Sequence, residues 1–360
     1  MYIFGKNYKK EELVKKIGNI SQLGALKDYQ FSDGLRKGVR ALDLKSPSGL
    51  DLTVVADRGL DISYMSYKSV PVSWRSAVPE TSPAFFESRG LEFLKTFYGG
   101  LLTTCGLTYM GAPSVDQGEE LGLHGRISNL SAESVCADGE WVQDDYRMVV
   151  RGKVREASVF GPKLQLSRKI STWMSSPMVT IEDEVENIGS QTYPLMVLYH
   201  INIGFPILDN SAELIEPKAK VWARDEEAEK GKKDFNRFCE PVKGYSEQVF
   251  FHDIKEDDRG FGNAAIINPD FDRGRGLGVA VRFKKDSLPN LAQWKMMGEG
   301  EYVCGLEPTN SWPRGRDVER KEGTLKFIEP GQKVKYRIDV NILTSNNDIE
   351  NYKKTLAKIL

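Results

Sequence analysis

The stretch Val179-Thr180-Ile181-Glu182-Asp183-Glu184-Val185-Glu186-Asn187-Ile188-Gly189-Ser190 predicts a β-strand that runs into a turn. Valine, isoleucine and threonine favour a pleated strand, and the glycine and serine at its end are typical of turns. A second strand, Tyr193 to Tyr199, follows directly and carries His200 at its end. Two consecutive strands therefore present a histidine in the middle of the chain.

The same pattern extends in both directions from these two strands. From Gly38 to Leu343, short runs rich in valine, isoleucine, leucine and tyrosine are separated by glycine, proline, serine and aspartate. One such unit is a predicted hairpin, in which Ser46-Pro47-Ser48-Gly49 forms the turn between Ala41–Leu44 and Leu52–Val55. Many short strands at this spacing predict an all-β fold, a large β-sandwich.

Four segments depart from the strand pattern. Lys9 to Asp28 has apolar residues every three to four positions, which predicts a helical arm. Ser82 to Phe97 predicts a helical insertion, Asp225 to Asn236 a charge-rich loop or solvated helix, and Asn347 to Leu360 a short terminal helix. No internal repeat or low-complexity linker divides the chain, so we expect one domain, with an arm over 1–37, the sandwich over 38–343 and a C-terminal helix over 344–360.

The charge balance argues against polyanionic partners. The 360 residues include 50 basic and 51 acidic side chains, a net charge of −1, and neither sign forms a long block. Nucleic-acid-binding proteins and proteins that bind anionic membranes usually carry a basic patch. We therefore expect a small-molecule partner, with no nucleic acid and no membrane, and a homo-oligomer remains compatible with the sequence.

Cysteine use and hydropathy predict a cytoplasmic protein. The four cysteines lie far apart, form no Cys-x-x-Cys pair and are sparse for a disulfide framework, so we expect free and mostly buried thiols. The first residues lack the apolar core of a signal peptide, and eighteen apolar residues never occur in a row.

Two of the three histidines lie in distinctive surroundings. His124 occurs in Gly-Leu-His-Gly-Arg-Ile-Ser-Asn (122–129), and His200 occurs in Leu-Tyr-His-Ile-Asn-Ile-Gly-Phe-Pro (198–206). A glutamate, Glu307, occurs in Gly-Leu-Glu-Pro-Thr-Asn (305–310). Histidine exchanges protons near neutral pH, so this set indicates acid/base chemistry and makes an enzyme the first hypothesis.

These segments resemble the aldose 1-epimerase (galactose mutarotase) superfamily. In that superfamily a strand of the form Val-Glu-Asn-x-Gly precedes a strand that ends in a catalytic histidine, as Val185 to Gly189 precedes His200 here. The resemblance implies a galactose-mutarotase-like β-sandwich over about residues 38–343. It also implies that His200 is the catalytic acid, Glu307 the catalytic base and His124 a substrate contact. The three occur in the family's order, at separations of 200 − 124 = 76 and 307 − 200 = 107 residues.

The chain departs from galactose mutarotase itself in one region. The family usually supplies an arginine to the sugar from the segment before the first histidine, but Gly99 to Leu107 contains none. The run Asp57-Arg58-Gly59-Leu60-Asp61 and the N-terminal arm look more like an uncharacterised bacterial branch, DUF4432. We therefore expect substrate contacts that differ from those of galactose mutarotase.

Interconversion of two anomers needs one base and one acid. The base removes the proton of the C1 hydroxyl, the acid protonates the ring oxygen, and the open aldehyde rotates before it closes again. Each proton transfer typically contributes about a hundred- to ten-thousand-fold in rate. Glu307 and His200 suffice for these steps, so no metal or organic cofactor is expected.

Further residues are candidate sugar contacts, and each has a structural alternative. A charged or amide side chain can bind sugar hydroxyls or seal the core, and a tryptophan can stack on a sugar or fill the core. Arg126 faces the side of His124 if its segment is extended, and Arg58 either contacts the substrate or forms an ion pair with its acidic neighbours. The third histidine, His252, is expected to be a strand-end residue. The candidate contacts are Arg58, Arg126, Asn202, Trp294, Lys295 and Asn310, with Trp312 of the same kind.

Other functions compete with an epimerase. A carbohydrate-binding protein would keep the sandwich and the cleft without turnover, and a sugar isomerase or lyase would use the same acid and base at carbon. A metal site would have to assemble three distant ligands, since no His-x-x-x-His pair is present. Nucleophilic catalysis by Cys105 or Cys304 lacks a charged neighbour that would lower the pKa of the thiol.

Overall fold

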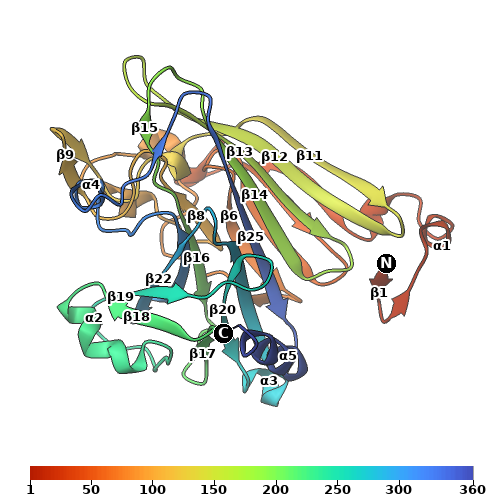
Figure 1. The fold of residues 1–360 in the computed structure, drawn as a ribbon. Helices are drawn as coiled ribbons and strands as arrows, with labels where there is room; N and C mark the ends of the chain where they lie inside the picture. The colour runs from red at the N-terminus through yellow and green to blue at the C-terminus, as the bar shows by residue number, and fades with distance from the viewer. Residues whose placement is uncertain (360) are drawn as a thin grey trace.

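A computed structural model describes residues 1–359 as two large antiparallel β-sheets packed face to face, as the sequence predicts (Figure 1). The first sheet has eight strands, in the order β11 (Glu133–Val142), β12 (Asp145–Ala157), β13 (Lys163–Trp173), β14 (Met178–Asn187), β25 (Lys333–Leu343), β21 (Leu277–Lys284), β20 (Phe261–Asn268) and β17 (Glu213–Ile215).

The second sheet has eleven strands and carries the histidine and the glutamate singled out above. Its order is β18 (Ala219–Ala223), β19 (Gln248–Ile254), β22 (Asn290–Met297), β23 (Tyr302–Thr309), β16 (Leu198–Gly204), β8 (Leu102–Cys105), β6 (Asp61–Tyr67), β5 (Leu50–Val55), β4 (Arg40–Lys45) and β3 (Ala25–Gln30), with β7 (Val70–Pro71) paired to β6. Three two-stranded sheets lie outside it: β1 (Tyr2–Ile3) with β2 (Lys6–Asn7), β9 (Ser114–Asp116) with β10 (Glu119–Leu121), and β15 (Tyr193–Pro194) with β24 (Phe327–Ile328).

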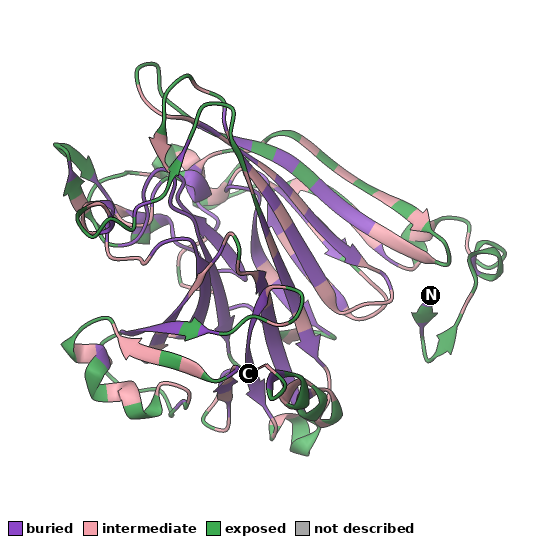
Figure 2. Ribbon diagram, in the orientation of Figure 1, coloured by how far each residue is buried: buried purple, intermediate pink, exposed green. Residues whose placement is uncertain are grey.

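Strand alternation places the core between the two sheets. In β14 Val179, Ile181 and Val185 are buried, while Glu182 and Glu184 point to the outer face. Every residue of β16 is buried, because this strand lies in the middle of its sheet and is covered on both faces. Figure 2 shows the same contrast, with buried residues along the inner strands and exposed residues in the peripheral helices and loops. The apolar residues of both sheets form one continuous cluster.

A buried polar network crosses this core. The Arg168 guanidinium in β13 binds Asp61 of β6 at 2.5 Å and Asp183 of β14 at 2.6 Å. It also donates to Thr104 Oγ1 at 2.8 Å, and the Tyr199 hydroxyl donates to Asp183 at 2.7 Å. The two carboxylates raise the pKa of Arg168 despite its burial, so the arginine is charged throughout the physiological range. The network ties the two sheets together directly behind the strand that carries His200.

The helices are short and lie at the periphery. They are α1 (Lys10–Val14), α2 (Glu226–Gly231), α3 (Phe271–Gly274), α4 (Arg316–Lys321) and α5 (Asn346–Leu356), with the 3-10 turns η1 (Ile20–Gln22), η2 (Gly34–Arg36), η3 (Pro83–Phe85), η4 (Glu92–Thr96), η5 (Ile127–Asn129) and η6 (Lys232–Asp234). Among residues 1–359, none of the helices is long and apolar enough to cross a membrane.

Several local predictions need correction. The helical arm predicted to reach Asp28 ends much earlier, because Ala25–Gln30 forms β3 and pairs with β4. The segment from Ser82 to Phe97 contains only the 3-10 turns η3 and η4 rather than a regular helix. His200 lies inside β16 instead of at a strand end, since the chain leaves β15 after Pro194 and β16 begins at Leu198. The predicted hairpin at residues 41–55 is present as β4 and β5.

Candidate active site

His200 and Glu307 lie side by side on neighbouring strands. β16 and β23 are antiparallel, and the register pairs Ile201 with Leu306, which places His200 opposite Glu307. Directly opposite residues share one face of a sheet. His200 Nε2 lies 3.0 Å from Glu307 Oε1, and both side chains are buried. A Cβ at Gly305 would lie 2.6 Å from Glu307 Oε1, so the glycine of Gly-Leu-Glu makes room for the carboxylate.

His124 joins this pair from a loop between β10 and η5. Its ring centroid lies 5.7 Å from that of His200. The loop is tightly folded, with φ of 60° at His124 and 79° at Gly125. A Cβ at Gly125 would lie 2.4 Å from the carbonyl oxygens of Gly106 and Tyr109, so the glycine lets this loop pack against backbone rather than against a ligand. The two histidines are thus brought together from segments that lie 76 residues apart in the sequence.

Polar atoms of all three side chains are buried without a hydrogen-bond partner. In the described part of the chain these atoms include Nδ1 of His124, Nδ1 of His200 and Oε1 of Glu307, whose short contact with His200 lacks the alignment of a hydrogen bond. Buried polar atoms in folded proteins are nearly always paired, with protein or with water. The three neighbouring side chains therefore retain hydrogen-bonding capacity that a polar ligand could use.

Burial shifts the proton affinities of these groups in opposite directions. Desolvation raises the pKa of Glu307 to about 8, and the negative charge of Glu247 adds to that effect. Desolvation lowers the pKa of His200 to about 3, with a further contribution from His124. The pKa of His124 falls to about 4 through desolvation and the positive charge of Arg224. At neutral pH Glu307 is therefore protonated and His200 is neutral. Together the two side chains hold one dissociable proton and carry no net charge.

The pair opens into a cavity of about 600 Å³, a size typical of ligand pockets. One wall is apolar and comes from the segment around η4, with Leu91, Phe93, Leu94 and Phe97, and from Leu123. The charged lining residues are Arg224, Asp225, Glu247 and Arg314. The remaining lining residues are Gly111, Ala112, Pro113, Val249, Trp294 and Pro313.

Three of these charged residues are paired with one another. Arg224 Nε donates to Asp225 Oδ2 at 2.7 Å, and Arg224 Nη2 donates to Glu247 Oε1 at 3.1 Å. Glu247 Oε2 in turn accepts the Trp294 indole N–H at 2.8 Å. Trp294 then packs edge-on against His200, with ring centroids 5.3 Å apart. These hydrogen bonds connect Arg224 through Glu247 to Trp294 and hold the indole ring of Trp294 against His200.

Trp294 lines the cavity, but its predicted neighbour Lys295 does not. Successive side chains of a strand point to opposite faces, so Lys295 faces away and donates to the Asp234 carbonyl at 2.8 Å. Desolvation lowers the pKa of this buried lysine. The prediction that both residues contact a ligand is wrong for Lys295.

The two candidate arginines also lie outside the cavity. Arg126 is exposed, because the turn at His124 and Gly125 breaks the extended conformation that its prediction assumed. Arg58 is fully buried and donates to the carbonyls of Ser128, Thr81 and Thr96, at 2.7, 2.9 and 2.8 Å. It forms neither a substrate contact nor the predicted ion pair with Asp57 or Asp61.

The two candidate asparagines hold backbone instead of lining the cavity. Asn202 Nδ2 donates to the Gly100 and His200 carbonyls, both at 3.1 Å. Asn310 accepts the Val197 N–H at 2.8 Å and donates to the Leu195 carbonyl at 2.9 Å. Each fixes β16 against a neighbouring segment, and we correct their role from substrate contacts to supports of the strand that carries His200.

His252 and Trp312 also lie away from the catalytic pair. His252 is buried inside β19, not at a strand end, with Nδ1 2.9 Å from the Glu216 carboxylate and Nε2 3.2 Å from Gln293 Oε1. Trp312 packs against Trp222 and Phe251, at ring-centroid distances of 5.2 and 4.5 Å.

Metal and thiol chemistry find little support in the geometry. No group of three His, Cys, Asp or Glu side chains within residues 1–359 is placed to hold a metal ion. The four cysteines are free; Cys105 and Cys304 are buried, whereas Cys136 and Cys239 are exposed. Burial raises the pKa of Cys304 to about 12 and also raises that of Cys105, which disfavours the thiolate.

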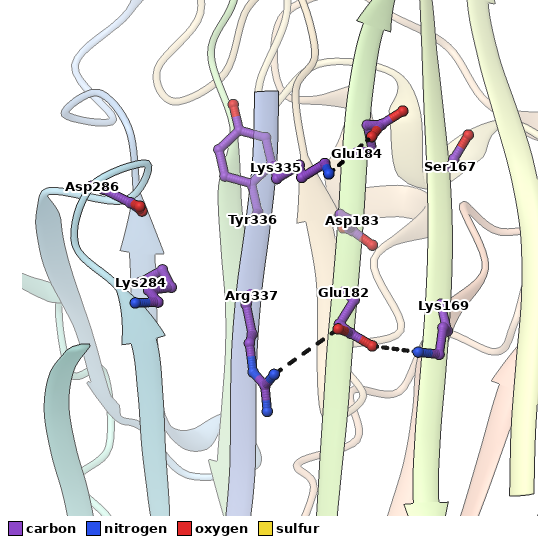
Figure 3. Close-up of a pocket in the computed structure, with 10 residues that line it drawn as sticks. All are labelled: Ser167, Lys169, Glu182, Asp183, Glu184, Lys284, Asp286, Lys335, Tyr336 and Arg337. Atoms are coloured by element: carbon purple, nitrogen blue, oxygen red, sulfur yellow. Dashed lines mark hydrogen bonds and ion pairs between the residues drawn. The ribbon is translucent and has the colours of Figure 1, made fainter. Parts of the chain in front are cut away.

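A second hollow lies on the outer face of the eight-stranded sheet, away from the catalytic pair (Figure 3). Its charges are paired across strands: Glu182 contacts Lys169 at 2.6 Å and Arg337 at 4.0 Å, and Glu184 contacts Lys335 at 3.9 Å. Such exposed pairs are typical of a solvated sheet face. We therefore place the candidate site in the cavity at His200 and Glu307.

Sequence reasoning missed Arg224, Glu247 and Arg314. Arg224 lies just after β18 at the start of the charge-rich segment, where a solvated loop or helix was expected. No local motif marks these residues. The pairing of β18, β19 and β22 brings Arg224 and Glu247 to the cavity, and Arg314 reaches it from the segment between β23 and α4. Arg224 and Arg314 therefore bring arginine side chains to the cavity, although residues 99–107 contain none.

Residues 36–342 match the family model described as "Domain of unknown function (DUF4432)". The chain belongs to this family. The match runs from β4 to β25, which leaves only β3 of the two large sheets outside it, and it confirms the resemblance inferred from the motifs around Arg58, His124, His200 and Glu307. No curated protein matches the DUF4432 chain.

Solved structures share the fold of this DUF4432 protein. A Klebsiella pneumoniae protein described as a putative aldose 1-epimerase matches with a TM-score of 0.88 and 24% identity, covering 93% of this chain and 88% of its own. A galactose mutarotase-like protein of Clostridium acetobutylicum matches with a TM-score of 0.60 and 17% identity, covering 89% and 99%. Galactose 1-epimerase of Lactobacillus acidophilus matches with a TM-score of 0.51 and 12% identity, covering 89% of this chain and 98% of its own. At these identities the likeness establishes the galactose-mutarotase-like fold.

Proposed function

We propose that this protein is a carbohydrate epimerase that interconverts the anomers of an aldose or modified sugar by acid/base ring opening and closure. The observation that carries the proposal is the buried pair of His200 and Glu307, 3.0 Å apart at the base of a cavity of about 600 Å³. The names of the structural neighbours point to the same class of reaction.

Mutarotation needs one proton acceptor and one proton donor, and in this proposal Glu307 and His200 supply them. In the reactive form of the pair, its one proton has passed from Glu307 to His200, which lies 3.0 Å away. Glu307 then accepts the proton of the C1 hydroxyl while His200 donates its proton to the ring oxygen, and the bond between C1 and the ring oxygen breaks. The open aldehyde turns about the C1–C2 bond, the ring closes on the other face of C1, and both protons return. A pKa of about 8 makes Glu307 a much stronger base than an ordinary carboxylate, whose pKa is 4.5. His124 is placed to hydrogen-bond a hydroxyl group of the same sugar.

The test is anomer exchange measured by NMR on a panel of freshly dissolved sugars. We expect wild-type protein to accelerate at least one sugar and His200→Ala to reduce that rate by about a hundred- to ten-thousand-fold. Arg126→Ala is the matched control, since Arg126 is exposed beside His124, and we expect it to keep the wild-type rate. If saturating wild-type protein accelerates no sugar of the panel, the proposal fails for those sugars.

The same spectra in deuterated water separate anomer exchange from chemistry at carbon. Mutarotation moves protons only between oxygen atoms, so we expect no deuterium at any carbon of the sugar. Incorporation at C2 would instead indicate the isomerase or lyase alternative.

The rate should also depend on pH in a way that the pair dictates. The active pair needs one proton, and it loses that proton as the pH rises through the Glu307 pKa of about 8. We therefore expect kcat/KM, corrected for spontaneous exchange, to be level between about pH 5 and 7 and to fall about tenfold per unit well above pH 8. A rate that rises through pH 8 would mean that carboxylate and neutral imidazole are the active forms.

A further inference from the structure

The cavity wall around η4 offers no polar side chain to a sugar. Leu91, Phe93, Leu94 and Phe97 line it from one segment, and Leu123 extends it. The hydrogen-bonding groups lie on the other sides of the cavity, at the catalytic pair and at Arg224 and Glu247. A hydroxyl group directed at the wall around η4 would find no side-chain hydrogen-bond partner there.

The apolar wall has two layers. Phe93 and Phe97 are buried and pack against His124 and His200, each at a ring-centroid distance of 5.3 Å. Leu91 and Leu94 lie at the cavity surface and remain 60% and 48% exposed. The inner layer therefore supports the histidines, and the outer layer leaves leucine surface uncovered beside the site. Apolar side chains that line a cavity are typical of small-molecule sites.

We propose that the cavity accepts an aldose in which an apolar group replaces or caps one hydroxyl group, a deoxy- or O-alkyl aldose, with that group against Leu91 and Leu94. For the reaction this inference rests on the proposed function, but the binding preference does not depend on turnover. A hydroxyl group at this wall would lose its water without gaining a partner, whereas a methyl group would cover the leucines. One such difference in an apolar pocket changes selectivity by roughly tenfold or more.

The experiment compares sugars that differ from a common parent at one position. D-Glucose is measured beside 2-deoxy-D-glucose, 3-O-methyl-D-glucose and 6-deoxy-D-glucose, by anomer-exchange efficiency and by the dissociation constant from NMR titration. We expect at least one apolar derivative to exceed glucose by roughly tenfold in affinity, and in kcat/KM if the protein turns it over. If glucose equals or exceeds every derivative, the inference is wrong.

Variants locate the preference on the wall. Leu91→Asn and Leu94→Asn should each lower the affinity for the preferred derivative relative to the affinity for glucose by at least threefold. The control is Leu35→Asn, because Leu35 is 47% exposed like Leu94 but lies outside the cavity, and its ratio should stay at the wild-type value. An unchanged ratio in both wall variants would overturn the assignment of the group to these leucines.

The outcomes also separate this inference from its parent proposal. If a derivative binds preferentially but its anomers do not exchange faster, the epimerase proposal fails and the inference about the leucine wall stands. If anomers exchange without any preference for a derivative, the epimerase proposal stands and the inference fails. Analytical sedimentation of the wild type and the variants tests whether a second copy of the chain, rather than a sugar, covers the leucine wall. If Leu94→Asn abolishes self-association while the sugar ratio is unchanged, a second copy of the chain covers the wall and the inference fails.

Discussion

Glu307→Gln is expected to abolish anomer exchange while the protein stays folded and keeps its affinity for sugar. Glutamine has the size of glutamate and retains hydrogen-bonding capacity, but it cannot accept the C1 proton. We expect kcat to fall by about a hundred- to ten-thousand-fold, with the dissociation constant of the sugar changed by less than about threefold. A non-catalytic carbohydrate-binding protein would show the same retained affinity but no wild-type rate to lose, so the two functions are distinguished by one pair of proteins.

The same substitution should make the fold more stable at neutral pH. The folded-state pKa of Glu307, about 8, lies above the ordinary value of 4.5. The stability contributed by the protonated carboxyl group is therefore complete below about pH 4.5 and is lost as the pH rises through about 8. Glutamine never ionises, so Glu307→Gln should raise the free energy of unfolding at pH 7 by on the order of 3 kcal/mol, with the gain vanishing at low pH.

Denaturant unfolding across a pH series provides the measurement. Glu301→Gln is the matched control, since Glu301 is exposed in the turn before β23 and should change neither the rate nor the stability. A Glu307→Gln protein that exchanges anomers at the wild-type rate would exclude Glu307 as the base. A loss of stability at pH 7 would instead show that its carboxylate is ionised and paired in the native protein.

Removal of Arg168 should destabilise the whole sandwich. Its guanidinium is the shared partner of Asp61 and Asp183, and all three side chains are fully buried. Arg168→Met leaves two carboxyl groups without a counter-charge in the core, which typically costs about 3–5 kcal/mol in the free energy of unfolding. The loss should be smaller at acid pH, where the carboxyl groups take up protons.

The neighbouring lysine gives the control for this experiment. Lys169 follows Arg168 in β13, points to the outer face of the sheet and pairs with Glu182 of β14. Such partly exposed pairs contribute only about 0–1 kcal/mol to the free energy of unfolding. We expect Lys169→Met to unfold at nearly the wild-type denaturant concentration. Neutralising Asp61 and Asp183 to asparagine together with Arg168→Met should recover part of the loss. A change below about 1 kcal/mol in Arg168→Met would mean that the network adds little to stability.

The sandwich and the candidate residues His200 and Glu307 could be predicted because their signals are local. Strand runs and turn residues mark β4, β5 and β14, and short motifs mark His124, His200 and Glu307. The exact end of the N-terminal arm could not be predicted, because Ala25 to Asp28 continues the apolar spacing of the preceding segment. Only pairing with β4 makes that stretch a strand.

The contact residues were harder to predict because their orientation depends on tertiary structure. Alternation along β22 excludes that Trp294 and Lys295 both face one cavity, and this much follows from the sequence once the strand is accepted. The turn at His124 that directs Arg126 into solvent does not follow, nor does the placement of Arg224 and Glu247 beside Glu307. Those depend on which strands become neighbours in the eleven-stranded sheet.

The side chains proposed to react and those proposed to select the sugar occupy different kinds of structure. His200 and Glu307 belong to adjoining inner strands of the sheet, whereas the leucine wall and Arg224 come from segments that connect strands. Connecting segments accept substitutions and changes of length more readily than strands at the centre of a sheet. In the proposed epimerase, natural or laboratory evolution could therefore alter residues 91–97 or 224–225 to admit a new sugar while the proposed acid/base pair is inherited unchanged.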